Sequence, residues 1–282
     1  MRNTSTGHEV SDAPWLDLHF RSARREYEES LREVGLQPGW VVLDAGCGGG
    51  NFLPLIGELV GAQGRIAALD LAPENLVRVG ALVRDGHCPD IIETRHGSML
   101  ALPYAEATFD GVWCANVVQY LSQDEFAAAV AEFRRVLKPG GTLAIKEFDV
   151  TMLQFLPMDR GMLQRFVSAR LASQVANGKM GTGTASHLPS YLRRFGLADI
   201  RRRGWLVERW APVPDATRGF VAELLGYFAS AAQTYDLAPD DRRAWRALGE
   251  HPAALLDDPD FCFREFFVLT VARNPGVPGG GE

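Results

Sequence analysis

A carboxylate stands directly before a glycine-rich turn, at the end of a short apolar run early in the chain. Residues 41–43 are Val, Val and Leu, the acid is Asp44, and glycines follow at alternate positions, Gly46, Gly48 and Gly50. The apolar run predicts a buried strand, while glycines permit positive φ angles and bring bare backbone close to a ligand. Asn51 then opens a helical apolar pattern that continues to residue 60. This order predicts a strand, a ligand-binding turn and a helix, the opening unit of an open α/β sheet.

Charge decides which ligand this turn can accept. A dinucleotide fold expects G-x-G-x-x-G, but Asn51 occupies the third glycine position and Asp44 would repel a pyrophosphate. The phosphate loop G-x-x-x-x-G-K-S/T is also missing, and residues 41–57 contain no Lys or Arg. S-adenosylmethionine carries a sulfonium and an ammonium, and it has no phosphate. The turn therefore predicts S-adenosylmethionine as the cofactor, with Asp44 facing its positive charge.

A second acid closes the next apolar run. Residues 64–69 read as a strand that ends at Asp70, and Pro73 then suits the first turn of a helix. An acid about 20 residues beyond a glycine turn commonly receives two ribose hydroxyls, and a hydrogen bond to a charged group contributes about 1.5–3 kcal/mol. We therefore expect Asp70 beside the ribose of the cofactor, with Leu71 next to it.

Further segments resemble the class I methyltransferases, the family that uses S-adenosylmethionine on a doubly wound sheet. The resemblance covers residues 36–148 and rests also on the segments HGSMLALPY at 96–104, FDGVWC at 109–114 and EFRRVLKPGG at 132–141. Within the family, the small-molecule branch with its quinone-biosynthesis and natural-product enzymes is the most similar. The resemblance implies that Ser98 and Met99 flank the adenine and that Cys114 and Ala115 approach the methionine part. The family often has an acid where Ser98 stands, so a weaker adenine contact is expected here.

Strand and helix patterns alternate through the first half of the chain. Strands are predicted at residues 40–44, 65–70, 91–96, 109–114 and 142–148, and helices at 51–60, 73–84 and 125–137. The last of these helices is the best defined, because Ser122 and Glu125 form a capping box. The alternation predicts an α/β fold with a doubly wound, mostly parallel, Rossmann-like sheet, which the family resemblance completes to seven strands.

The pattern changes beyond residue 148. We expect a helical insertion at 149–186, a return to the core at 187–210, a second helical insertion at 211–261 and a final strand at 262–273. Helices are predicted there at 152–175, 188–195, 220–232 and 240–248, close to the strand ends where ligands bind in open sheets. The insertions therefore predict a helical lid over the substrate.

The two ends of the chain carry weaker patterns. Residues 1–35 combine a polar segment with a helix predicted at 14–35, which family members use to close the cofactor site. Residues 274–282 are rich in Gly and Pro and are predicted to be disordered.

Composition restricts the class of protein further. The chain has 282 residues, of which 46% are hydrophobic, so it can bury a sizeable core, and its net charge of −6 argues against a nucleic-acid partner. The cysteines form no C-x-x-C pair and no signal peptide is evident, which predicts a cytoplasmic enzyme. No apolar stretch approaches the roughly 18–20 residues of a membrane span. A homodimer is a possible assembly.

Methyl transfer to a hydroxyl or to an enolisable carbon needs a base that removes a proton at some stage. The candidates are Glu147, which ends a core strand, and His187 with Tyr191, which begin the helix after the first insertion. Each has a structural interpretation too, since His187 can start a helix, Glu147 can pair with a neighbouring lysine and Tyr191 can pack. Paired strand-end acids that would indicate magnesium are not evident, so no metal is predicted. By family analogy the substrate side is lined by Asn116, Gln119 and Tyr120.

These patterns predict transfer of a methyl group from S-adenosylmethionine to a small, partly apolar acceptor at oxygen or carbon. A natural-product or quinone-like metabolite of secondary metabolism fits this description. Methylation of nitrogen is an alternative, and so is a methyltransferase-like module that binds the cofactor without transferring a methyl group, because a fold does not guarantee a reaction. A nicotinamide-dependent oxidoreductase is a third alternative, against which Asp44 and Asn51 argue.

Overall fold

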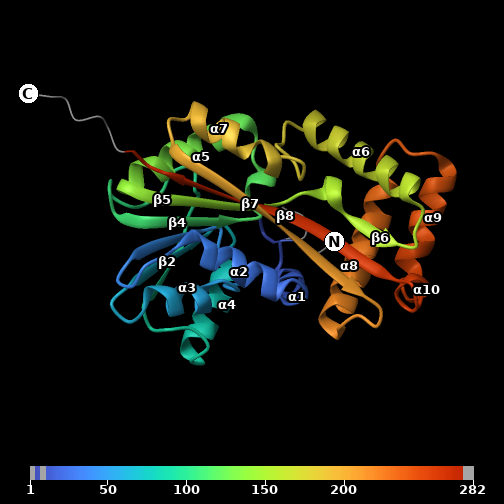
Figure 1. Ribbon diagram of the computed structural model, residues 1–282, viewed down its shortest axis with the longest axis horizontal. Coiled ribbons are helices and arrows are strands. Elements are labelled where there is room, and N and C mark those ends of the chain that lie inside the picture. The colour runs from blue at the N-terminus through green and yellow to red at the C-terminus, as the bar shows by residue number, and fades with distance from the viewer. Residues whose placement is uncertain (1–3, 7–10, 276–282) are drawn as a thin grey trace, which may run out of the picture.

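The computed structural model, which describes residues 4–6 and 11–275, is built around one twisted sheet (Figure 1). The strand order is β3-β2-β1-β4-β5-β8-β6, with β7 paired to β8 beside this path. Strands β1 to β5 are parallel, and β8 runs antiparallel to β5, β6 and β7. The bounds are β1 Val41–Ala45, β2 Arg65–Asp70, β3 Ile92–His96, β4 Phe109–Ala115, β5 Leu137–Phe148, β6 Gln154–Leu156, β7 Ala198–Trp210 and β8 Cys262–Arg273. The doubly wound α/β prediction is confirmed, and the short β6 makes the sheet eight-stranded where seven strands were expected.

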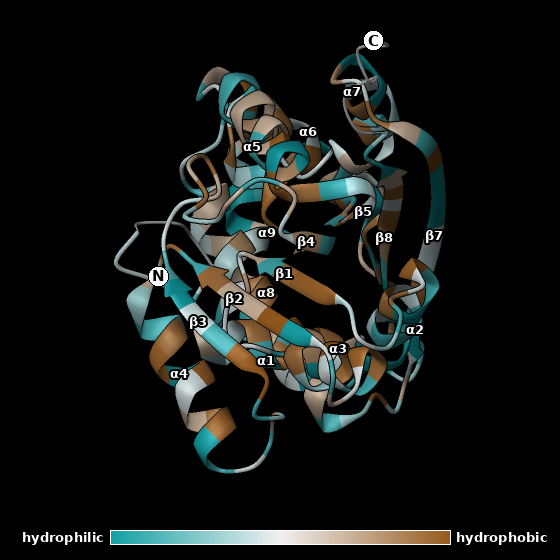
Figure 2. Cartoon of the chain, turned by 90° about the vertical axis from the view of Figure 1, so that its left-hand side faces the viewer, coloured by the Kyte–Doolittle hydropathy of each residue, from teal (hydrophilic) through white to brown (hydrophobic). Residues whose placement is uncertain are grey.

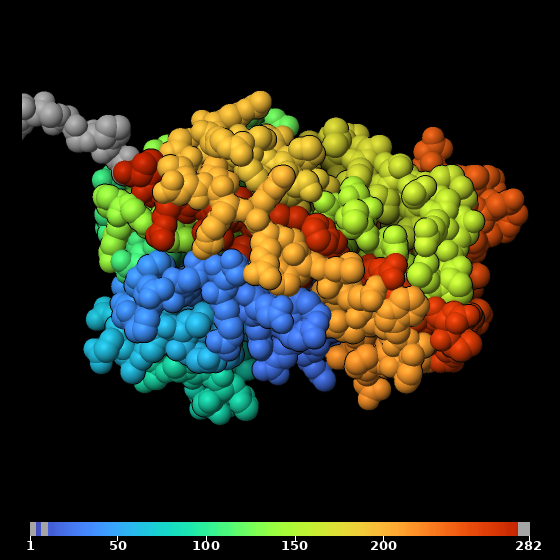
Figure 3. Space-filling view, viewed as in Figure 1, coloured from blue at the N-terminus to red at the C-terminus, as the bar shows by residue number. Residues whose placement is uncertain are grey.

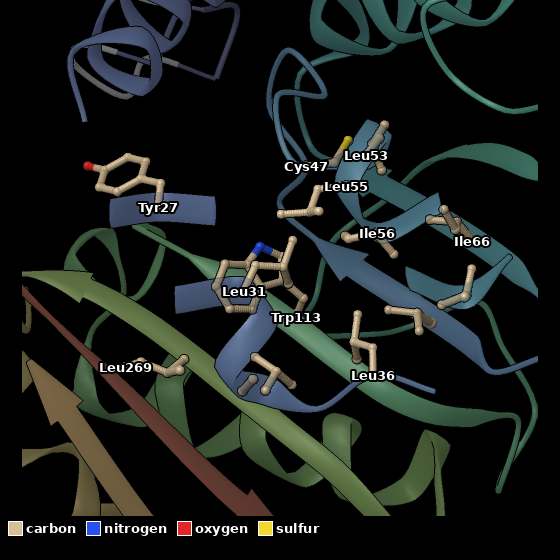
Figure 4. Packing of buried hydrophobic residues seen from close by; sticks show 14 of the residues in the cluster. Tyr27, Leu31, Leu36, Cys47, Leu53, Leu55, Ile56, Ile66, Trp113 and Leu269 are labelled. Carbon is tan, nitrogen blue, oxygen red and sulfur yellow. The ribbon is translucent and has the colours of Figure 1, made fainter. Parts of the chain in front are cut away.

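Helices cover both faces of the parallel strands (Figure 2). One face packs against α2 (Arg24–Val34), α3 (Leu53–Val60) and α4 (Pro73–Arg84). The other face packs against α5 (Gln123–Val136) and α7 (Leu188–Arg194). Figure 4 shows part of the first core, where Tyr27 and Leu31 from α2 join Trp113 from β4 and Leu269 from β8. Because both faces are buried, the carboxyl ends of the parallel strands are left as the edge where a ligand can bind.

A third core lies among the inserted helices, which are seen at the right of Figure 1. Tightly packed aromatic rings form its centre, with the ring centroid of Phe166 4.6 Å from those of both Phe228 and Trp245. This core also takes in α1, which packs along α8, and the two lie side by side in Figure 3 as blue and orange surfaces. The elements are α1 Ala13–Ser22, α6 Arg160–Ala176, α8 Asp215–Ala232, α9 Pro239–Glu250 and α10 Ala253–Leu256.

The N-terminal helix predicted at 14–35 is two helices. Asp12 caps α1 by accepting a hydrogen bond from the backbone of Trp15 at 3.2 Å, and the helical path stops at Ala23, whose φ and ψ are −113° and 18°. The break changes the direction of the chain, so α1 packs on the inserted helix α8 while α2 packs on α3 and β7. Periodicity did not reveal the break because the apolar spacing continues across it.

Two other boundaries differ from the predictions. The helix expected at 152–175 begins only at Arg160, because a 3₁₀ turn at Val150–Met152 and strand β6 come first. The segment 138–141, which lies between the helix predicted at 125–137 and the strand predicted at 142–148, belongs to β5, which starts at Leu137. Of the predicted terminal segments, residues 1–3, 7–10 and 276–282 lie outside the described residues.

Candidate functional site

The glycine turn after β1 is held by the neighbouring strand. Gly46, Gly48 and Gly50 all have positive φ, at 81°, 51° and 83°. The backbone N–H groups of Gly46 and Cys47 both donate to the carbonyl of Leu69, at 2.8 and 3.0 Å. A Cβ on Gly46 would lie 2.6 Å from a methyl group of Val117, so only glycine fits there. The turn is therefore a rigid cradle of backbone atoms.

Asp70, at the end of β2, helps to build this cradle. Its Oδ2 accepts from the backbone N–H of Gly48 at 2.7 Å, and its Oδ1 accepts from that of Ala72 at 2.8 Å and from the side chain of Asn75 at 3.3 Å. A carboxylate has about four acceptor positions, so Oδ2 keeps room for a hydroxyl of a ligand. The structure thus gives Asp70 a second task, the support of the turn, which the sequence did not indicate.

Asp44, at the end of β1, is buried without a full set of partners. Only 2% of its surface is exposed, and its Oδ2 has no hydrogen-bond partner within the described ranges. Burial, helped by the nearby charge of Asp70, raises the pKa of Asp44 to about 8. An opposite charge would relieve both effects. The site therefore suits a positively charged group, and this is the property expected for S-adenosylmethionine.

A cavity of about 290 Å³ opens at the carboxyl ends of the strands. Its far wall comes from the inserted helices and from α1, and includes Trp15, Arg170, Phe220, Leu224 and Phe228. Most of the predicted cofactor and substrate residues line it: Asp44, Gly46, Gly48, Asn51, Asp70, Leu71, Ser98, Met99, Ala115, Asn116, Gln119 and Tyr120. The residues predicted for the cofactor and those predicted for the substrate thus line one cavity.

Two predicted cofactor residues do not line the cavity. Gly50 faces the helix packing instead, where an added Cβ would lie 3.0 Å from Val79 and 3.1 Å from Leu53. Cys114 is fully buried in the core on the α5 side of the sheet, because alternate residues of a strand point to opposite faces. Both contribute to the site only by packing.

The structure does not bring the three predicted bases to the cavity. His187 is exposed at the end of the 3₁₀ turn Ala185–His187. Tyr191 packs edge-on against Phe126, with ring centroids 6.1 Å apart. Glu147 is buried below the strand ends, where it accepts from the backbone N–H of Val118 at 2.7 Å and burial raises its pKa to about 7.

A different polar group reaches the acceptor side of the cavity. His19 of α1 places its Nε2 2.9 Å from Oε2 of Glu265 on β8 and 2.8 Å from the hydroxyl of Tyr27 on α2. The imidazole also stacks on Phe220 of α8, with centroids 4.3 Å apart and planes 4° from parallel. All four of these residues line the cavity. They hold the ring of His19 in one orientation.

The sequence contained a signal for His19. Trp15 and His19 are four residues apart, which places them on one helical face. Glu265 stands out as an acid within the apolar run of β8. Patterns within a single segment could not connect His19 with Glu265, because 246 positions separate them in the chain.

Lys146 adds a buried ammonium to this group. It is fully buried in β5, donates from Nζ to Oδ1 of Asn116 at 3.0 Å, and lies over the ring of Tyr27 at 3.5 Å from its centroid. Burial lowers the pKa of Lys146 to about 7, against the opposing effect of the Glu265 charge. Asn116 itself has a φ of 59°, a left-handed conformation that Asn tolerates better than most residues. Such strained positions concentrate at functional sites.

Residues 4–6 and 11–275 contain neither a candidate metal site nor a candidate membrane-spanning helix. No cluster of three or more His, Cys, Asp or Glu side chains is arranged to hold a metal ion there. No helix in these ranges combines the length and apolar character needed to cross a bilayer.

Comparison with known proteins places the glycine turn and the strand-end acids in a family. Residues 42–141 match the family model described as a methyltransferase domain. These residues are a methyltransferase domain. The matched segment runs from β1 into the start of β5, so it contains Asp44, Asp70 and the residues after β4. The domain is thus of the S-adenosylmethionine-dependent type, as the charge of the turn predicted.

Relatives of known activity match part of this chain. It is 29% identical over 134 residues to the demethylmenaquinone methyltransferase of Alkalihalophilus pseudofirmus, and the match covers 46% of this chain and 54% of that protein. The chain therefore spans about half the length of the curated relatives it matches. The inserted helices with Arg170 and Phe220 lie outside the segment that matches the family model.

Solved structures support the fold of the whole chain. A putative methyltransferase from Bacillus halodurans superposes with a TM-score of 0.57 at 17% identity, covering 88% of this chain and 98% of that one. The cyclase SpnF superposes with a TM-score of 0.54 at 20% identity, covering 90% of this chain and 82% of that one. At these identities the likeness concerns the fold alone, and the second structure is of a protein named for a different reaction.

Proposed function

We propose that this protein transfers a methyl group from S-adenosylmethionine to a small, partly apolar acceptor at oxygen or carbon. The observation that carries the proposal is the buried Asp44 carboxylate, which lacks a cationic partner in the described ranges and lines the same cavity as the glycine turn. When bound, S-adenosylmethionine supplies a methyl group already activated by its sulfonium. Asp44 would face the positive part of this cofactor, Asp70 its ribose, and Ser98 with Met99 its adenine.

His19 is the best-placed base for the acceptor. Its Nε2–H can donate to the Glu265 carboxylate, an assignment made from the hydrogen-bond network. Nδ1 then keeps its lone pair, and the imidazole has no other hydrogen bond to the described residues. Glu265 and the stacked Phe220 act as positioning residues, because they hold the imidazole while its Nδ1 is left for the acceptor. A base held in this way favours an acceptor that must lose a proton, such as a phenol or an enolisable carbon.

The inserted segments 149–186 and 211–261 are proposed as the lid of this site. They contribute Val150, Arg170, Phe220 and Phe228 to the cavity wall, and α1 closes the space between them and the core. This largely aromatic wall supports a ring-containing acceptor. A quinone-like or natural-product metabolite is consistent with it, and demethylmenaquinone methyltransferases are among the relatives.

Two measurements test the proposal. Calorimetric titration of the full chain with S-adenosylhomocysteine should show binding, and titration with NADH should show none. Incubation with methyl-labelled S-adenosylmethionine and a panel of phenols and enolisable ketones should then give a labelled product. Binding without any labelled product, including from amines, would support the module that binds the cofactor but does not transfer a methyl group. Binding of NADH in preference would favour the oxidoreductase alternative.

A further inference from the structure

Arg170, on the lid side of the cavity, is buried without a counter-charge. Only 7% of its surface is exposed, and it lines the cavity from the middle of α6. Its Nη1 donates to the hydroxyl groups of Tyr227 at 2.8 Å and Tyr235 at 3.3 Å, whereas Nε is buried and has no partner. Both of its hydrogen-bond acceptors are thus neutral phenols, and no ion pair within the described part of the chain includes it.

Other arginines of the protein have the carboxylate partner that Arg170 lacks among the described residues. Arg165 lies in the same helix and is more exposed, yet it makes two hydrogen bonds of 2.7 Å to the carboxylate of Asp241. Arg209 is partly buried and pairs with Glu26 at 2.7 Å. A guanidinium removed from water normally needs such a partner, because its lost hydration is otherwise not compensated. Arg170 is therefore a cation whose partner has to come from elsewhere.

The guanidinium has donors to offer. It carries five N–H bonds in a planar fork, of which the described residues use only those on Nη1. Nη2 makes no hydrogen bond to them, and no described carboxylate forms an ion pair with the guanidinium. A planar carboxylate is the anion that best matches this fork.

The surroundings limit the rest of the ligand. Trp15, Phe220, Leu224 and Phe228 line the same cavity and present apolar and aromatic surface. The other cation on this wall, Lys179, lies 3.8 Å from the carboxylate of Glu125 and so has its own partner. One unpaired positive charge in an apolar chamber fits a ligand with one negative charge and an apolar body, and does not fit a multiply charged phosphate.

We propose that the methyl acceptor is a carboxylic acid with an aromatic body, whose carboxylate binds to Arg170. The body would pack against Trp15 and Phe228, and the acceptor atom would point away from the carboxylate toward His19 and the glycine turn. This inference rests on the proposed function, because it names the class of acceptor for that reaction. The proposal also gives Arg170 a role in specificity, since only an acceptor with a carboxylate would neutralise its guanidinium.

The test uses a matched pair of probes, 2-naphthoate and its neutral analogue 2-naphthamide. Each is titrated calorimetrically into the full chain saturated with S-adenosylhomocysteine. We expect the acid to bind wild-type protein at least tenfold more tightly than the amide. In Arg170→Gln the affinity for the acid should fall at least tenfold and that for the amide should be unchanged. Arg165→Gln, in the same helix but on the Asp241 side, is the control and should keep the preference.

Several outcomes would overturn the inference. They are equal affinity of wild-type protein for the acid and the amide, a preference that persists in Arg170→Gln, and binding of neither probe at millimolar concentration. The comparison in wild-type protein needs no variant, so it holds even when Arg170→Gln fails to fold. The preceding titration separates the two levels of the proposal. If S-adenosylhomocysteine binds but the acid shows no advantage, only the acceptor class is wrong; if it does not bind, the proposed function fails and this inference fails with it.

Discussion

Burial without a partner sets Asp44 apart from the other strand-end residues. Its pKa of about 8 lies above the ordinary value of 3.8, so between these pH values the folded protein holds a proton that the unfolded chain has lost. Stability from this group therefore falls as the pH rises from about 4 to about 8. The unpaired carboxylate is a cost to the fold that a positively charged ligand would remove.

The Asp44→Asn variant should separate the effect of the buried carboxylate on stability from its effect on cofactor binding. At pH 8–9, without cofactor, we expect the variant to melt at a higher temperature than wild-type protein, because it buries no charge. We also expect its affinity for S-adenosylmethionine to fall at least tenfold, since a hydrogen bond to a charged group contributes about 1.5–3 kcal/mol. Thermal denaturation and calorimetry measure the two effects. A lower melting temperature together with unchanged affinity would show that Asp44 has a purely structural role.

His19 and His187 can be compared directly. We expect His19→Gln to lower kcat by about 10²–10⁴, the usual contribution of a general base, with little change in cofactor affinity. His187→Gln should keep near-normal turnover, because His187 is exposed outside the cavity. Steady-state kinetics with an acceptor that wild-type protein methylates decides between the two histidines. The reverse result would assign the role of base to His187.

Glu265→Gln tests how His19 is held. The variant keeps a hydrogen-bond acceptor at the same place but removes the negative charge beside Nε2. We expect kcat to fall while KM stays near its wild-type value, because the imidazole loses the carboxylate that holds its orientation. An unchanged kcat would argue that Glu265 serves packing alone.

At the scale of elements, the contact between α8 and α9 determines how firmly the lid is built. A Cβ on Gly249 of α9 would lie 2.4 Å from Cβ of Ala229 on α8, whereas a Cβ on Gly226 of α8 has nothing within 4 Å. The two helices thus approach closely only because residue 249 has no side chain. The same glycine-to-alanine change should have opposite effects at the two positions.

We expect Gly249→Ala to destabilise the protein by about 1–3 kcal/mol, the usual range for overpacking. Gly226→Ala should stabilise it by up to about 1 kcal/mol, because alanine is the better helix former and the space is open. Chemical denaturation of both variants provides the measurement. Equal effects in the two variants would contradict the close approach of α8 and α9.

At the scale of the whole molecule, the cavity couples the core to the lid. Its lining includes strand-end residues of the core, α1, and the inserted helices α6 and α8. A ligand that fills this space should stabilise the folded chain by about 2.7 kcal/mol at 100 times its Kd. For a chain of this size we expect S-adenosylhomocysteine to raise Tm by about 5–10 °C. Differential scanning calorimetry checks this value, and NADH at the same concentration should give no shift. An increase with both ligands, or with neither, would argue against a specific cofactor site.

The cofactor half of the protein could be predicted almost entirely from local patterns. The turn at Gly46 and Gly48, the acids at Asp44 and Asp70, and the order of strands and helices all depend on residues close together in the chain. Parallel strands bring their carboxyl ends to one edge of the sheet, so residues that end different strands, such as Asp44 and Asp70, lie close together. The cytoplasmic location and the homodimer remain predictions, because nothing in the fold bears on them.

The acceptor half depended on contacts between distant segments. His19 and Glu265 are 246 positions apart, and Arg170 became a cavity residue only when α6 packed beside α8. The residues next to them in the sequence do not indicate these long-range contacts. His187 and Tyr191 were predicted as bases, but His187 is exposed to solvent and Tyr191 packs against Phe126. The sequence by itself determined the strand–turn–helix cradle and its preference for positive charge, because those are properties of short segments. Only the tertiary structure decided which histidine and which arginine line the cavity, because side-chain proximity between distant segments is set by how whole helices pack.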